Sequence, residues 1–156
     1  MSVQNPFTAD PDRHAIWDML MPRDFAAFAA QDWSMVEPDF DQTRFLGIHA
    51  HFSPNEDEWN AGFPTLETYR DEWLRQAAES AGETFARPLP EQLIEAVTLD
   101  QIDINGEVAV AHKKFDGKVE KADGSHDQLN WQTLYFCRKN AGRWQITGFV
   151  GYMKYK

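Results

Sequence analysis

The sequence predicts a single-domain α+β fold, and two observations indicate it. Helical apolar periodicity is concentrated in the first 87 of the 156 residues, whereas the last 60 residues consist almost entirely of strand and turn patterns. Such segregation favours α+β over an alternating α/β arrangement. A chain of this length fits one domain spanning residues 1–156, since single domains cluster near roughly 100–150 residues.

The first predicted helix begins at Asp10-Pro11, because aspartate caps helix N-termini and proline tolerates the first helical position. Pro22 should kink or split this helix near its middle. Its inner stripe consists of apolar residues at helical spacing: Ile16, Trp17, Leu20, Phe25 and Phe28.

A strand and a second helix follow. The stretch "TRFLGIHAHF" (43–52) is typical of a short strand, and "SPNEDEWNAGF" (53–63) of a polar loop. The stretch "PTLETYRDEWLRQAAESAG" (64–82) predicts a long helix that ends near Gly82. Its inner stripe is Leu66, Tyr69, Trp73 and Ala77.

Three turns organise the C-terminal strands: Asn105-Gly106, Asp123-Gly124 and Asn140-Ala141-Gly142. Each turn fixes a register, and opposed residues share a face of the sheet. The three registers predict that Phe115 pairs with Gln132 and that Phe136 pairs with Ile146. They place Trp144 and Ile146 on the helix-facing side, together with six residues that are not purely apolar: Thr98, Asp100, Lys113, Asn130, Gln132 and Tyr152.

The opposite face carries Trp131, Tyr135, Phe149 and Met153 in these registers. A monomer rarely exposes so large an apolar patch. We therefore expect a homodimer that packs through this face.

Composition excludes several other partners. The net charge is −10, and the 15 basic side chains form no cluster that suits nucleic acid. The single cysteine, Cys137, excludes an intrachain disulfide framework, and no Cys/His spacing suggests zinc. The N-terminus "MSVQNPFTADPDR" lacks a signal-peptide pattern, and no long uncharged run could span a bilayer. We expect a cytoplasmic protein with neither a membrane nor a nucleic-acid partner.

The order of elements resembles the nuclear transport factor 2-like superfamily, which includes ketosteroid isomerases, SnoaL-like polyketide cyclases and scytalone dehydratase. The resemblance rests on "RDFAAFAAQDW" (23–33), "INGEVAVAH" (104–112) and "YFCRKNAGRWQITGF" (135–149), and it covers nearly the whole chain. It implies a cystatin-like fold in which a curved antiparallel sheet wraps around the long N-terminal helix, encloses a conical pocket and commonly dimerises. It implies no single activity, because one fold hosts catalytic and purely binding members. Scytalone dehydratase-like proteins carry a Tyr-Asp pair where this chain has Phe28 and Ala29, so that chemistry is not carried over.

Ligand-binding candidates are the polar residues assigned to the inner face. Gln132 and Asn130 could orient a carbonyl, Tyr152 could donate a hydrogen bond, and Asp100 could act as a base if burial raised its pKa. In the alternative that we favour for Asp100 and Lys113, they form an ordinary ion pair at the rim. Trp17 and Phe28 are core candidates that could also line the pocket.

Catalytic candidates are Asp32, His49 and His51. Asp32 lies near the end of the first helix, where it could serve as an acid or base or, as we favour, cap the following turn. His49 and His51 point the same way on a strand and could act as an acid/base at the pocket mouth. A metal site shared with the acidic residues of 56–58 is the less favoured alternative, because those residues suit a solvated loop.

These features lead to a small-molecule-binding domain as the first functional hypothesis. If the domain is an enzyme, it would catalyse isomerisation, dehydration or cyclisation of an apolar carbonyl compound by acid-base chemistry, with neither cofactor nor metal. The alternative is a non-catalytic ligand-binding or dimerisation module. A third option is a structural subunit that resembles the small β component of ring-hydroxylating dioxygenases.

Overall fold

The first helix of the chain is interrupted in its middle. In the computed structural model, which describes residues 3–156, it comprises α1 (Pro11–Asp18), the π-helical turn η1 (Met19–Arg23) and α2 (Asp24–Ala30). The Asp10 carboxylate accepts a hydrogen bond from the Arg13 backbone N–H at 3.1 Å, which confirms the predicted helix start. Pro22 lies inside the π-helical turn, so the predicted interruption is also confirmed.

Short elements connect this helix to the sheet: η2 (Trp33–Met35), η3 (Glu37–Asp39), β1 (Leu46–His49), η4 (Glu56–Glu58) and β2 (Asn60–Phe63). The second long helix, α3, spans Leu66–Ala81 and begins at a capping box formed by Thr65 and Thr68. A further helix, α4 (Leu89–Ala96), was not expected, since its eight residues hold barely two turns of periodicity.

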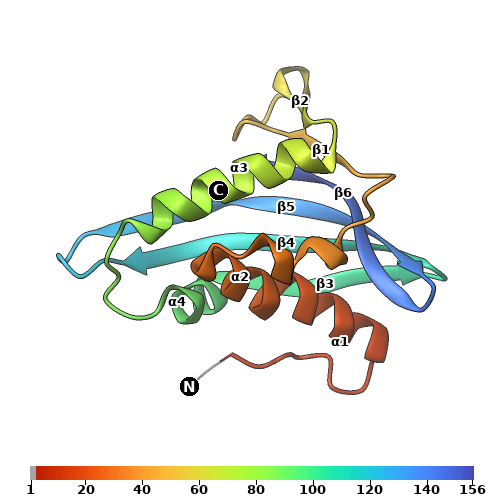
Figure 1. The fold of residues 1–156 in the computed structure, drawn as a ribbon, viewed down its shortest axis with the longest axis horizontal. Helices are drawn as coiled ribbons and strands as arrows, with labels where there is room; N and C mark the ends of the chain where they lie inside the picture. The colour runs from red at the N-terminus through yellow and green to blue at the C-terminus, as the bar shows by residue number, and fades with distance from the viewer. Residues whose placement is uncertain (1–2) are drawn as a thin grey trace.

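Six strands form one sheet in the order β2-β1-β6-β5-β4-β3. The long strands are β3 (Val97–Asn105), β4 (Val108–Glu120), β5 (His126–Asn140) and β6 (Arg143–Met153). They pair antiparallel, whereas β1 runs parallel to β6, so the sheet is mixed rather than wholly antiparallel. All the labelled helices lie on one side of the sheet (Figure 1). We call the helix-covered side the concave face and the opposite side the convex face. The α+β class is confirmed.

The core lies between the concave face and the helices. Trp144 and Ile146 are buried there, as predicted. The Trp144 indole Nε1 also donates to the Asp12 carboxylate of α1 at 2.9 Å, which ties the last strand to the first helix. No helix within residues 3–156 has the length and apolarity that a membrane crossing needs.

The predicted register between β4 and β5 is wrong by one residue. Phe115 pairs with Trp131 rather than Gln132. The turn is longer than the two-residue turn expected, because the Lys121 N–H donates to the Ser125 carbonyl and Gly124 adopts a φ of +89°. A shift of one residue turns every side chain of the strand to the other face. Trp131 and Tyr135 therefore lie on the concave face, and Asn130 and Gln132 on the convex face.

Irregular pairing in β3 and β6 changes two further assignments. The β3–β4 register shifts between Thr98 and Gln101, so Thr98 and Asp100 are exposed rather than inward. Ile146 pairs with Cys137 rather than with the predicted Phe136. The β5–β6 register shifts after Ile146, which brings Phe149 into the core instead of the convex face. Each shift corresponds to an extra residue in one strand, which reverses the alternation beyond it.

These corrections remove the predicted dimer surface. Tyr135 and Phe149 are buried, and with Trp131 they belong to the concave face, so they cannot form an outer interface. The convex face instead exposes Val108, Val110 and Phe136. A dimer through the convex face stays a prediction, with different residues.

Candidate functional site

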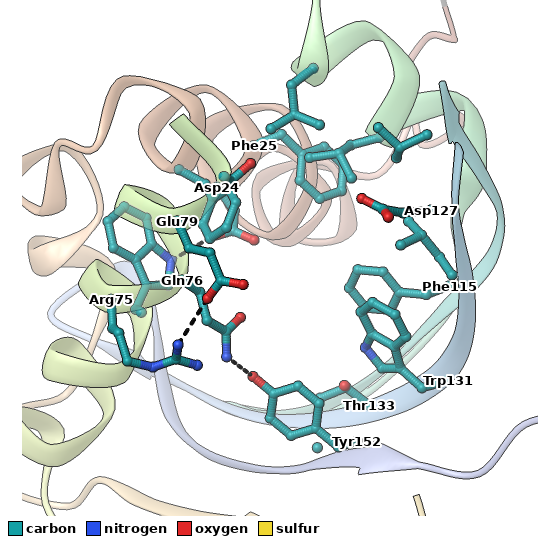
Figure 2. Close-up of a pocket in the computed structure, with 18 of the residues that line it drawn as sticks. Asp24, Phe25, Arg75, Gln76, Glu79, Phe115, Asp127, Trp131, Thr133 and Tyr152 are labelled. Atoms are coloured by element: carbon teal, nitrogen blue, oxygen red, sulfur yellow. Dashed lines mark hydrogen bonds and ion pairs between the residues drawn. The ribbon is translucent and has the colours of Figure 1, made fainter. Parts of the chain in front are cut away.

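A cavity of about 560 Å³ lies between the helices and the concave face. Helices α2, α3 and α4 contribute one side of its wall, and strands β4, β5 and β6 contribute the other. Figure 2 shows the labelled side chains arranged around an open centre, with the curved sheet behind Phe115, Trp131 and Thr133. The long strands reach this position because the sheet is twisted and bulged, which bends it around the helices.

Aromatic rings make up much of the wall. Phe115 and Trp131, opposed on β4 and β5, stack with centroids 4.5 Å apart and planes 16° apart. On the helical side, Phe28 and Trp73 meet edge to face at 5.6 Å. Such pairs hold their rings at defined angles, so the wall offers flat, fixed surfaces to a ligand.

An ion pair closes the inner end of the cavity. Lys113 is 0% exposed, and its Nζ donates to the Asp24 Oδ2 at 3.1 Å and to the Leu20 carbonyl. The Asp24 side chain is 30% exposed and lines the cavity, whereas Lys113 does not line it. Burial lowers the pKa of Lys113, and the neighbouring Asp24 carboxylate opposes that shift.

The π-helical turn explains how a lysine can be accommodated here. The Asp24 N–H donates to the Met21 carbonyl instead of the Leu20 carbonyl that a regular α-helix would use, and the Leu20 carbonyl accepts from Lys113. The Lys113 ammonium also lies over the Phe25 ring at 4.6 Å. These contacts offset the cost of burying a cation.

Further polar groups lie along the cavity wall. The Gln76 Nε2 donates to the Tyr152 hydroxyl at 3.0 Å, which links α3 to β6 across the cavity (Figure 2). Burial raises the pKa of Tyr69 and of Tyr135, and the charge of Asp24 contributes to both shifts. Both tyrosines therefore stay protonated at neutral pH and can donate a hydrogen bond.

The rim of the cavity carries four exposed charged residues: Arg75, Glu79, Glu83 and Asp127. Arg75 is held by two carboxylates, Glu72 and Glu79. Lys121 bridges Glu83 at 2.8 Å and Asp127 at 3.3 Å. Four carboxylates thus share two cations at the rim, which leaves an excess of negative charge.

His49 and His51 lie beside the cavity rather than in its lining. Their rings stack with centroids 4.1 Å apart, and His49 also stacks on the cavity residue Tyr152 at 4.4 Å. Burial lowers the pKa of His49, and the nearby His51 adds to this effect. His51 and Tyr152 both have positive φ angles of 53° and 57°, an unusual backbone conformation for residues other than glycine.

The other predicted site residues are dispersed. Asp32 caps η2 by accepting from the Ser34 N–H at 3.1 Å, which is the capping role favoured above. Trp17 is buried in the core. Asp100 is exposed on β3 and makes no pair with Lys113, whose partner is Asp24.

Gln132 and Asn130 interact with other groups on the convex side. The Gln132 amide contacts His112 at 2.7 Å and the Lys154 carbonyl at 2.8 Å, and Asn130 accepts from the Lys156 N–H at 3.0 Å. Their assignment to the pocket is wrong because of the shifted β4–β5 register. Of the predicted binding residues, Phe28 and Tyr152 line the cavity.

The sequence predictions missed Asp24, Gln76, Trp131 and Thr133. A signal for Asp24 was present: it lies four residues after Leu20 and four before Phe28, so a carboxylate occupies the apolar stripe of the first helix. The positions of Trp131 and Thr133 depend on a single turn residue and had no separate signal.

Neither a reactive thiol nor a group of metal-binding side chains is present among residues 3–156. Burial raises the pKa of the Cys137 thiol to about 12, which disfavours the thiolate that a nucleophile needs. Among residues 3–156, no three His, Cys, Asp or Glu side chains are grouped so that they could hold a metal ion.

Comparison with solved structures identifies the fold. The chain is 16% identical to an NTF2-like protein of unknown function from Shewanella baltica, with a TM-score of 0.57 over 92% of this chain and 94% of that one. An NTF2-like superfamily protein from Salmonella enterica serovar Typhimurium is 15% identical, with a TM-score of 0.55 over 90% and 89%. A conserved protein from Planctomyces limnophilus is 14% identical, with a TM-score of 0.58 over 90% and 94%.

No family model and no curated protein matches the chain. The structural likeness therefore establishes the fold, and the predicted nuclear transport factor 2-like fold is confirmed.

Proposed function

From the nuclear transport factor 2-like fold and the geometry of its concave face, we propose that the protein binds a small aromatic or alicyclic molecule. The observation that carries the proposal is the cavity of about 560 Å³, whose walls hold several aromatic rings and whose rim is charged. Small-molecule sites typically measure about 300–1,000 Å³ and combine an apolar wall with a few placed polar groups.

The wall chemistry specifies what such a ligand would contact. The stacked Phe115 and Trp131 offer one flat surface, and the Phe28–Trp73 pair offers another from the helical side. Asp24, Thr133 and the Tyr152 hydroxyl are the groups that would orient it. A compact ring system with one polar substituent satisfies this arrangement.

Isothermal titration with indole as the probe tests the proposal, with a matched pair of variants on β5. Leu129 lines the cavity, whereas Leu134 faces the convex side, and both are half-buried. Leu129→Trp should fill the cavity and weaken indole binding at least about tenfold. Leu134→Trp adds the same bulk outside the cavity and should leave binding unchanged.

If indole and comparable ring compounds give no binding heat and no thermal stabilisation of the wild type, the proposal fails. Equal loss of binding in both variants would also contradict it, because the effect would then be independent of the cavity.

The partly exposed carboxylate of Asp24 beside aromatic cavity walls favours a second candidate, proton-transfer catalysis of the isomerase or lyase type. Asp24 is fixed by Lys113 and lies near two protonated tyrosines. As a base, Asp24 would take a proton from the carbon beside a ketone, and Tyr69 or Tyr135 would donate a hydrogen bond to the resulting enolate oxygen. Returning the proton to another carbon would complete an isomerisation without a cofactor.

Deuterium exchange into 2-tetralone, a bicyclic ketone with acidic hydrogens, tests this candidate by NMR. The wild type should accelerate exchange at least about 100-fold over buffer. The double variant Asp24→Asn/Lys113→Met removes both charges while keeping similar shapes, and it should lose the acceleration. Binding of the ketone without accelerated exchange would exclude catalysis and leave the binding function intact.

A further inference from the structure

The charge of the ligand can be inferred from the orientation of the ion pair at the inner end of the cavity. Asp24 lines the cavity, and one of its oxygens, Oδ2, accepts from the Lys113 Nζ at 3.1 Å. The other oxygen, Oδ1, accepts one long hydrogen bond, from the Trp73 Nε1 at 3.4 Å. A ligand entering the cavity therefore meets the negative end of this pair.

The positive end is inaccessible. Lys113 lies outside the cavity lining and is fully buried against Phe25, Phe115 and Tyr135, with its ammonium 4.6, 5.2 and 5.7 Å from the three ring centroids. Its donors are directed to the Leu20 carbonyl and to Asp24. A ligand carboxylate or phosphate thus finds no cation at the inner end.

The aromatic walls and the charged rim of the cavity also favour a positively charged ligand. Aromatic faces carry partial negative charge and attract cations, which suits the rings of Phe115, Trp131 and Trp73. At the rim, the carboxylates outnumber the cations, because Arg75 and Lys121 are each shared between two acids. An anionic ligand would be repelled at both ends of the cavity.

We propose that the cavity selects ligands with a cationic amine on an aromatic or alicyclic body, and that the ammonium binds Oδ1 of Asp24, the oxygen that is not paired with Lys113. This inference rests on the proposed binding function. It differs from the catalytic candidate, in which Asp24 must stay free to take a proton from carbon.

A matched series of three probes tests the inference on the wild-type protein: indole is neutral, tryptamine is a cation and indole-3-acetate is an anion at pH 7. In isothermal titration, tryptamine should bind at least about tenfold more tightly than indole, because its ammonium forms a charge-assisted hydrogen bond. Indole-3-acetate should bind more weakly than indole.

Three further measurements show whether Asp24 or the rim causes the preference for tryptamine. The preference for tryptamine should persist in about 0.5 M NaCl, because salt screens the exposed rim much more than the partly buried Asp24. The double variant Asp24→Asn/Lys113→Met should bind indole and tryptamine with affinities within about threefold of each other. The rim variant Glu79→Gln/Asp127→Asn should keep most of the preference.

The possible outcomes distinguish the preference for cationic ligands from the proposed binding of small molecules. Indole binding with no preference for tryptamine overturns the inference and leaves the cavity function standing. A preference that vanishes in salt or in the rim variant overturns the role of Asp24. If none of the three probes binds, the proposed binding function itself fails.

Discussion

The two faces of the sheet use neighbouring residues for opposite purposes. On β5, Tyr135 is 8% exposed and packs against the cavity and core, whereas the next residue, Phe136, is 38% exposed on the convex face. Val108 and Val110 on β4 extend the exposed apolar surface. Because successive strand residues point to opposite faces, a single strand builds both a sheltered cavity and an uncovered apolar surface.

This difference indicates two kinds of interaction. The concave face is enclosed by helices and leaves a space of molecular size, which suits a small ligand. The convex face is broad and lacks a covering helix, which suits a second protein surface. Substitutions on one face at a time distinguish the two roles.

Breaking the ion pair from one side should have the largest effect. Asp24→Ala leaves the fully buried Lys113 without its carboxylate and should cost about 3–5 kcal/mol in the free energy of unfolding, measured in urea. Asp24→Ala/Lys113→Met removes the unpaired charge and should recover most of that loss. Asp100→Ala, on an exposed carboxylate of β3, serves as the control and should change stability little. Equal stability of the single and double variants would contradict the buried pair.

Truncating adjacent residues on β5 compares the two faces directly. Tyr135→Ala removes a buried ring and should cost about 3 kcal/mol or more in the free energy of unfolding. Phe136→Ala removes a partly exposed ring and should cost clearly less in a monomer. The measurement is urea unfolding at low protein concentration. A larger loss for Phe136→Ala would show that the assignment of faces is reversed.

A charge on the convex face should disrupt the predicted dimer. Phe136→Glu would place a carboxylate at the centre of an apolar contact, where loss of one large anchor costs about 2 kcal/mol or more of association free energy. Light scattering should then show one chain instead of two. Ala78→Glu, at an exposed position of α3 on the other side of the sheet, is the control for added charge. A wild type that is monomeric at every concentration would contradict the dimer prediction.

The pH dependence of His49 should be the smallest of these effects. Burial and His51 hold its pKa below the usual 6.5, so the unfolded chain binds the proton more readily. Stability associated with neutral His49 is therefore present above about pH 6.5 and is lost as the pH falls toward 5. The loss should stay below about 1 kcal/mol, because water screens this partly exposed ring.

Urea unfolding at two pH values tests this prediction. The wild type should lose more stability between pH 7 and pH 5 than His49→Gln does, since the variant cannot titrate there. Identical losses would show that His49 does not contribute.

The sequence was sufficient to predict the fold because the signals for helices, strands and turns are local and occur many times along the chain. Asp10-Pro11 specified a helix start, Pro22 its interruption, and the alternation around Trp144 and Ile146 a buried strand face. Several such signals agreed with one another, so an error in any one of them would not have changed the architecture.

The site was harder to predict because it depends on register. One additional residue in the Lys121–Ser125 turn moved Trp131 into the cavity and Gln132 out of it. The irregular pairing after Ile146 moved Phe149 from the predicted convex face to the concave face. Turn signals identify where a hairpin turns but not its length, and one residue is enough to exchange the faces. Asp24 could have been found, since a carboxylate within an apolar helical stripe needs a partner.

Small-molecule binding at the concave face can be observed directly through the indole N–H signals of the six tryptophans. Trp73 and Trp131 line the cavity. In an NMR titration of nitrogen-15-labelled protein with unlabelled tryptamine, their indole signals should therefore shift in a saturable way. Trp17 and Trp144, buried in the core away from the cavity lining, should shift little. Saturable shifts confined to residues of the convex face, or no shifts with either tryptamine or indole, would contradict ligand binding at the concave face.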